Sequence, residues 1–82
     1  MIIAWDEVKR LSNLAKHRLD FASIERGFDF EAAKITPSKS GRFKAVGRLN
    51  DRPVVVIFST LGAEAISIVS LRPASRKERV VL

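Results

Sequence analysis

Arginine and glutamate are concentrated near the C-terminal end of the chain, in a pattern suited to binding an anion. An apolar run at 65–71 is followed by Arg72 and Pro73, and then by the basic segment Ser-Arg-Lys-Glu-Arg at 75–79. Ser75 and Glu78 have the spacing of a capping box, so the pattern predicts a strand that ends in an arginine and leads directly into a helix. Arginine binds phosphate through paired N–H groups, which makes this segment the first place to look for chemistry.

The chemistry that fits such a segment is cleavage of RNA by its own 2′-hydroxyl group. A protein that promotes this reaction aligns the attack, neutralises the charge developing on the phosphate and helps protons to move. Amides at the start of the helix at Ser75 are expected to add anion-binding groups. The arginines expected to converge on one phosphate are Arg42, Arg72, Arg76 and Arg79.

These residues also have ordinary structural explanations. Glu78 fits a capping role better than the role of a catalytic base. Arg42, Lys44 and Arg48 alternate along one strand, where exposed charges can protect a sheet edge or bind a protein. The residues alone therefore indicate a basic domain that binds an anionic partner.

Composition excludes several other kinds of site. His17 is the only histidine and there is no cysteine, which excludes a two-histidine ribonuclease mechanism, a thiolate metal site and a multi-histidine metal site. No cofactor or metal is expected. The chain has 15 Lys plus Arg against 9 Asp plus Glu, a net charge of +6. This balance favours nucleic acid or an acidic protein as the partner.

The N-terminal third is predicted to contain a strand and two helices. Residues 2–5 form the strand, Asp6 caps a helix that ends near His17, and Asp20 caps a second helix that stops at Gly27. Lys16 and His17 would in any case stabilise the negative end of the first helix. The residues predicted to form the buried face of the first helix are Val8, Leu11, Leu14 and Ala15, opposite Lys9, Arg10, Asn13 and Lys16.

The rest of the chain predicts an antiparallel meander. Residues 42–49 alternate between apolar and basic, 54–58 are apolar throughout, and 65–71 form the third strand, while 30–36 fit either strand or helix. The expected fold is one α+β domain over residues 1–82, with two N-terminal helices packed on a curved, mainly antiparallel sheet and a short C-terminal helix. No apolar run approaches the ~18 residues of a membrane span, and no signal peptide is predicted, so a cytoplasmic location is expected.

Three segments together resemble BrnT-type toxins of bacterial type II toxin–antitoxin systems. The first comprises Ala-Trp-Asp-Glu-Val-Lys at 4–9 and Ser-Asn-Leu-Ala-Lys-His at 12–17. The second is Arg42-Phe with Val46-Gly47, and the third runs from Ile66 to Arg79 as Ile-Ser-Ile-Val-Ser-Leu-Arg-Pro-Ala-Ser-Arg-Lys-Glu-Arg. One departure is Arg18, where relatives usually carry glycine and a tight left-handed turn.

This resemblance implies a small ribonuclease of RelE-like fold that blocks translation by cutting RNA. It also implies a BrnA-type antitoxin that binds DNA and could join the toxin in a heterotetramer. Arg72 and Arg79 would stabilise the phosphate, and Lys16 or Glu78 would transfer protons. The full set of residues implied is Lys16, Arg42, Arg72, Glu78 and Arg79 in catalysis, with His17, Arg48 and Arg76 in substrate binding. A catalytically inactive module that binds protein or nucleic acid is the alternative.

Overall fold

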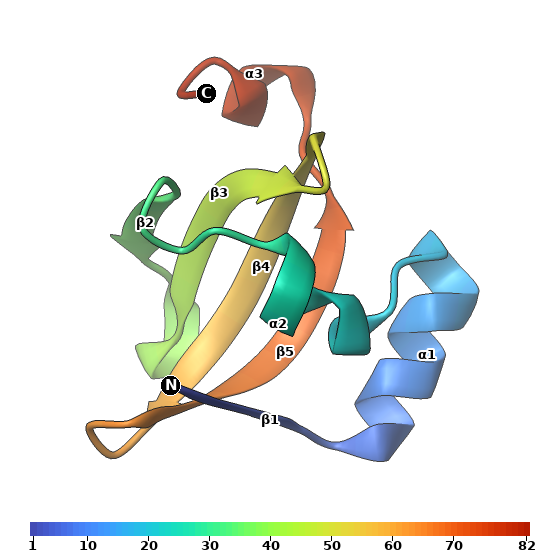
Figure 1. Cartoon of the computed structure of the whole chain (residues 1–82), viewed down its shortest axis with the longest axis vertical. Coiled ribbons are helices and arrows are strands. Elements are labelled where there is room, and N and C mark those ends of the chain that lie inside the picture. Colours follow the sequence, from blue (N-terminus) through green and yellow to red (C-terminus); the bar gives the residue numbers. More distant parts are fainter.

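The computed structural model describes all residues, 1–82, and shows an α+β fold built on a five-stranded sheet (Figure 1). None of its helices has the length and apolar character needed to cross a membrane. The elements in chain order are β1 (Ile2–Trp5), α1 (Glu7–His17), a 3-10 turn (Phe21–Ser23), α2 (Ile24–Gly27), β2 (Lys34–Pro37), a 3-10 turn (Lys39–Gly41), β3 (Phe43–Leu49), β4 (Arg52–Leu61), β5 (Ala65–Pro73) and α3 (Arg76–Arg79).

The sheet has the strand order β1-β5-β4-β3-β2. The β3–β4–β5 meander is antiparallel, as the short connections predict, and β2 extends it by pairing with β3. β1 runs parallel to β5, so the sheet is mixed. The ambiguous segment before Pro37 therefore contributes an edge strand, Lys34–Pro37.

The prediction of two full N-terminal helices is wrong for the second helix. Asp20 does cap it, with its side chain accepting from the Ala22 amide, but a 3-10 turn is followed by only one turn of α-helix. Gly27 does not adopt a left-handed conformation, and the chain leaves α2 through an extended Phe28. The reason is tertiary: Phe28 bridges to Leu49, and the Gly27 carbonyl accepts from the Asn50 amide.

The hydrophobic core lies between this short helical segment and one face of the sheet. Phe21 and Ile24 are completely buried, and Phe28 packs with them. Gly47 on β3 makes room for Phe28, because a Cβ there would lie 2.7 Å from the ring. The sheet side of the core comprises Ala45, Leu49, Val54, Val56, Phe58, Ile66, Ile68 and Leu71.

The buried side of α1 differs from the prediction. Val8 and Leu11 are exposed, whereas Asn13 is buried and Arg10 is half-buried, with a 2.8 Å bond to Asp20. The cause is the position of α1 beside β5. Because β1 pairs only with residues 65–68 of β5, the helix lies along the part of β5 that has no strand partner on this side. The backbone edge beyond this point needs polar partners, and an apolar helix face cannot supply them.

Asn13 supplies the missing partner for β5. Its Nδ2 donates to the Leu71 carbonyl at 2.8 Å and to the Leu19 carbonyl at 3.1 Å, and its Oδ1 accepts from the Leu71 amide at 3.1 Å. The side chain thus pairs with Leu71 as a neighbouring strand would. α1 ends at His17, as predicted, and Arg18 adopts the left-handed turn itself, at φ 60°.

A β-bulge in β5 decides which side chains face the core. Ile57 pairs with Ser70 and Phe58 pairs with Ile68, so Val69 has no partner on β4. Ile68 and Leu71 both point into the core although they are three residues apart. The bulge therefore turns Ser70 and Arg72 to the opposite face, called here the open face of the sheet.

Candidate active site

The open face brings basic and hydroxyl side chains of four strands into two adjacent rows. Because directly paired residues project from the same face of a sheet, the rows follow from the strand register. The first row is Lys34, Val46, Val55 and Arg72, and the second is Thr36, Lys44, Ile57 and Ser70. Arg72 on β5 and Lys44 on β3 therefore lie on the same face, with β4 between them.

Glu78 on α3 joins these two cations. Arg72 donates from Nη1 and Nη2 to the two carboxylate oxygens, both at 2.8 Å, and Lys44 Nζ lies 2.6 Å from Oε2. The predicted capping box is confirmed: the Ser75 amide donates to Glu78 Oε1 at 2.8 Å, and the Glu78 amide donates to Ser75 Oγ at 3.2 Å. The local turn thus fixes the carboxylate over the sheet.

The electrostatics of this cluster favour the charged state of each member. The hydrogen bonds from Arg72, reinforced by Lys44 and by the Ser75 amide and hydroxyl, hold the pKa of Glu78 far below its usual range. The bonds to Glu78 raise the pKa of Arg72. Glu78 therefore stays ionised at neutral pH and is poorly suited to accept a proton. Its contacts favour capping and positioning of the cations.

The stability of the fold should fall in acid, partly through Glu78. A glutamate in the unfolded chain has a pKa of about 4.3. Since its pKa is lower in the folded protein, its contribution is present above the unfolded value and is lost as pH falls toward the folded value. Urea denaturation at pH 7 and pH 3 should show a smaller loss of unfolding free energy in Glu78→Gln than in the wild type.

Asp20 provides the matched control, because the bond from Arg10 lowers its pKa as well. Asp20→Asn should remove a separate part of the acid sensitivity, and the two effects should add because no hydrogen bond connects the clusters. If Glu78→Gln and the wild type lost the same unfolding free energy between pH 7 and pH 3, the attribution of acid sensitivity to Glu78 would be contradicted.

A groove of about 430 Å³ opens beside this cluster. Lys34, Lys44 and Lys77 line it together with Ser75 and Glu78. Lys44 was not among the residues predicted to act, although its alternation with Arg42 along one strand is the signal that could have identified it. Three lysines around one carboxylate leave an excess of positive charge, so the groove can accept an anion.

Lys16 and His17 lie in a second groove, between α1 and β5. It measures about 340 Å³, and its polar lining is Lys9, Ser12, Asn13, Lys16, His17 and Ser70. Ser70 also belongs to the second row of the open face. The two grooves thus border the same face, and no hydrogen bond or ion pair joins Lys16 to Arg72 or Glu78.

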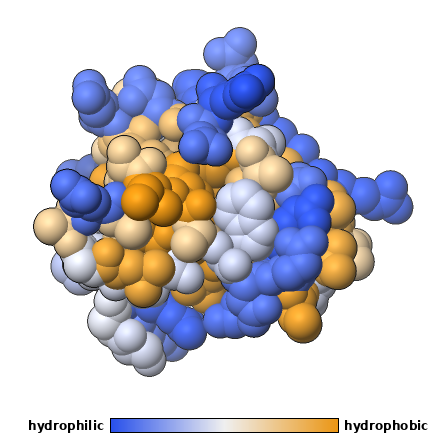
Figure 2. Space-filling model, turned by 60° about the horizontal axis from the view of Figure 1, so that its bottom comes forward, coloured by the Kyte–Doolittle hydropathy of each residue, from blue (hydrophilic) through white to orange (hydrophobic).

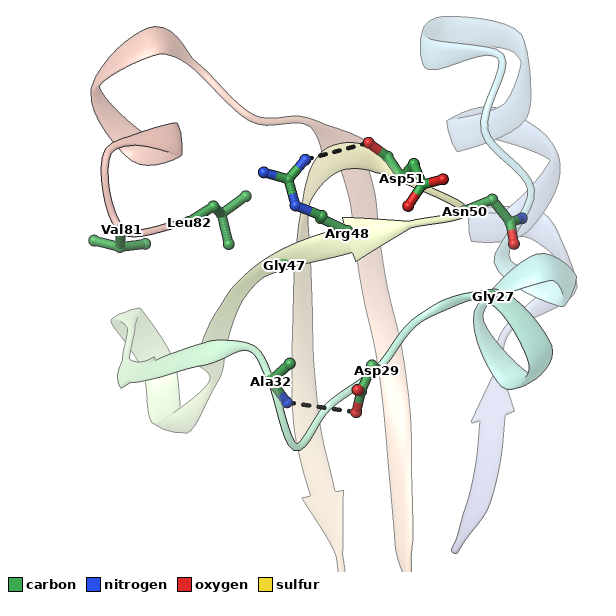
Figure 3. A pocket seen from close by; sticks show the side chains of 9 residues that line it. All are labelled: Gly27, Asp29, Ala32, Gly47, Arg48, Asn50, Asp51, Val81 and Leu82. Carbon is green, nitrogen blue, oxygen red and sulfur yellow. Dashed lines mark hydrogen bonds between the residues drawn. The ribbon is translucent and has the colours of Figure 1, made fainter.

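No hydrogen bond or ion pair joins the remaining predicted site residues to Arg72. Arg42, Arg76 and Arg79 are exposed and form no side-chain hydrogen bond or ion pair, so their roles stay predictions. Arg48 lines a separate hollow of about 460 Å³ and donates to the Asp51 carbonyl at 3.3 Å (Figure 3). The carboxylates of Asp29 and Asp51 line the same hollow, which makes it less suited to phosphate.

Comparison with known proteins identifies the family that this chain resembles. The family model described as "Ribonuclease toxin, BrnT, of type II toxin-antitoxin system" matches residues 5–78. The crystal structure of the Brucella abortus ribonuclease toxin BrnT is 46% identical, covers 93% of this chain and 99% of its own, and superposes with a TM-score of 0.81. A comparison with curated protein sequences gave no match.

Proposed function

The chain belongs to the BrnT family of ribonuclease toxins of type II toxin–antitoxin systems, and on this premise we propose that it is a metal-independent endoribonuclease. Cleavage proceeds by attack of the RNA 2′-hydroxyl on the adjacent phosphate. The observation that carries this proposal is the cluster of Arg72, Lys44 and Glu78 on the open face. No three metal-ligating side chains lie close enough to hold a metal ion.

Arg72 and Lys44 bind the scissile phosphate in this proposal. Two cations and one carboxylate leave the cluster with a net charge of +1, which matches one phosphodiester. Arg72 uses three N–H groups, two toward Glu78 and one toward the Pro73 carbonyl. Since a guanidinium has five, two remain for phosphate oxygens. Glu78 is a positioning residue, because it fixes the directions of both cations before the substrate arrives.

Proton transfer is assigned to the groove beside α1. Lys16 and His17 border the open face through Ser70, so they can approach a nucleotide next to the bound phosphate. A histidine exchanges protons near neutral pH, and a lysine can do so when its pKa is lowered by its surroundings. Arg42, Arg76 and Arg79 contribute exposed positive charge that attracts RNA, and Arg48 contacts it at the margin.

The biological setting follows from the family. As a type II toxin, the chain has an antitoxin partner and an RNA substrate. We assign the antitoxin to the BrnA type, place both proteins in the cytoplasm as a heterotetramer, and attribute toxicity to arrested translation. A RelE-like arrangement of the sheet belongs to the same proposal.

A second candidate function is a module that binds protein or nucleic acid without cleaving it. The observation in its favour is that Glu78 already neutralises part of the charge of Arg72 and Lys44. Such a protein would bind RNA with a steep dependence on salt but form no product.

The decisive experiment is RNA cleavage by the purified protein in EDTA. We expect full-length RNA to shorten at the same rate with and without the chelator, giving products with 2′,3′-cyclic phosphate ends. Glu78→Gln should lower kcat more than it raises KM, because it disturbs the alignment of the cations in the transition state. RNA binding without products would support the second candidate instead.

A further inference from the structure

The exposed side of α1 carries apolar residues that nothing in this chain covers. Val8 is 74% exposed and Leu11 54% exposed, and Ala15 lies one turn beyond Leu11 and is also exposed. These three residues form one stripe, called here the outer α1 face. In the space-filling view the right side, where α1 lies, shows small areas of apolar surface beside polar side chains, and a broader apolar area lies at the left and centre (Figure 2). The helix thus has Asn13 buried and Leu14 half-buried on its inner side, with Val8, Leu11 and Ala15 outside.

Positive charge borders this stripe on the side of the sheet. Lys9 directly follows Val8 and Lys16 directly follows Ala15. Both lysines are exposed, and both line the groove that leads to Ser70. A partner that covers Val8 and Leu11 must therefore place negative charge opposite these lysines, or leave them partly desolvated without a counterion.

We propose that the outer α1 face binds an acidic amphipathic segment of the antitoxin. This inference rests on the proposed function, because that function supplies the partner. The apolar side of the segment covers Val8 and Leu11, and its carboxylates pair with Lys9 and Lys16. The groove continues from these lysines to Ser70. Ser70 lies in the same row of the open face as Lys44, with Ile57 between them, so the bound segment extends toward the active cluster.

A second copy of this chain fits the same face less well. If two α1 helices packed antiparallel through Leu11, Lys9 of one copy would lie near Lys16 of the other, on the same side of the contact. Like charges held this closely repel each other. The chain also carries a net charge of +6, which favours an acidic partner over a second basic molecule.

The experiment measures binding of the purified full-length cognate antitoxin by calorimetry. Val8→Asp/Leu11→Asp places two carboxylates on the stripe and should raise the Kd at least about 100-fold, since each apolar contact is lost and each new charge meets an acidic segment. Lys9→Glu should raise the Kd about tenfold at low salt, and this effect should shrink at 0.5 M NaCl. Circular dichroism melting confirms that each variant folds.

Leu61→Asp is the matched control, because Leu61 is 51% exposed at the far end of β4. It should bind the antitoxin like the wild type. Leu11→Asp alone, which lies outside the groove of Lys16 and His17, should still cleave RNA at the wild-type rate and escape neutralisation. If the wild type did not cleave RNA, the proposed function would be refuted but the inference about α1 would not, because binding of the antitoxin is measured separately.

Three results would overturn the inference. One is wild-type affinity in Val8→Asp/Leu11→Asp, and another is an equal loss of affinity in Leu61→Asp. The third is a wild-type dimer in sedimentation that Leu11→Asp converts to a monomer, since the face would then bind a second copy.

Discussion

Replacing Arg72 with alanine should lower the rate of RNA cleavage by about 100- to 1,000-fold, the usual cost of losing one donor to the transition state. Arg72 provides the paired N–H groups of the cluster and lies in the first row of the open face. Without it, Lys44 remains as the one partner cation of Glu78, and the net charge of the cluster falls from +1 to zero. Single-turnover cleavage of a short labelled RNA gives the chemical step directly.

One variant of Arg72 separates loss of charge from loss of geometry, and an arginine on α2 provides the control. Arg72→Lys keeps the positive charge but loses the bidentate contact, so its activity should fall between those of wild type and Arg72→Ala. Arg26→Ala removes an exposed arginine on α2 and should cleave RNA like the wild type. A folded Arg72→Ala protein that retains more than a third of wild-type activity would refute the assignment of Arg72.

Replacing Asn13 with alanine should destabilise the fold by about 2–4 kcal/mol, a large share of the roughly 5–15 kcal/mol of a small domain. The change removes three hydrogen bonds and leaves the amide and carbonyl of Leu71 and the carbonyl of Leu19 buried without these partners. Equilibrium urea denaturation measures the effect as a shift of the midpoint.

Ser12→Ala is the control for this loss, because Ser12 is the exposed neighbour of Asn13 and its change should leave stability within about 0.5 kcal/mol of wild type. Asn13→Asp should also be destabilising, since a carboxylate has no N–H to donate to the two carbonyls. A midpoint for Asn13→Ala equal to that of Ser12→Ala would show that α1 is anchored by other contacts.

The features that could be predicted from the sequence depend on neighbours along the chain. Asp6 caps α1 by accepting from the Val8 amide two residues on, and Ser75 and Glu78 form their capping box within one turn. Alternation over 43–49 correctly separated the core side of β3 from its basic side. The family resemblance, carried by motifs spread over the chain, is confirmed.

The features that could not be predicted depend on contacts between distant segments. The helical period of Val8 and Leu11 is typical of a buried face, but the neighbour of α1 is a free strand edge, which requires the amide of Asn13. Glu78 could be recognised as a cap, whereas its contact with Lys44 depends on the register of three strands and on the direction in which α3 leaves β5.

The unpaired Val69 also has a consequence for changes in chain length. Its presence shifts the alternation of β5 by one step, so that Ile68 and Leu71 point inward and Arg72 points outward. Deleting Val69 would remove the bulge and restore simple alternation, with Leu71 still pointing inward and Arg72 still on the open face. An insertion in the turn at 62–64 would leave this phase unchanged. The extra residue thus sets the phase of the C-terminal half of β5, and a strand of the same length without the bulge would direct the guanidinium of Arg72 toward the core.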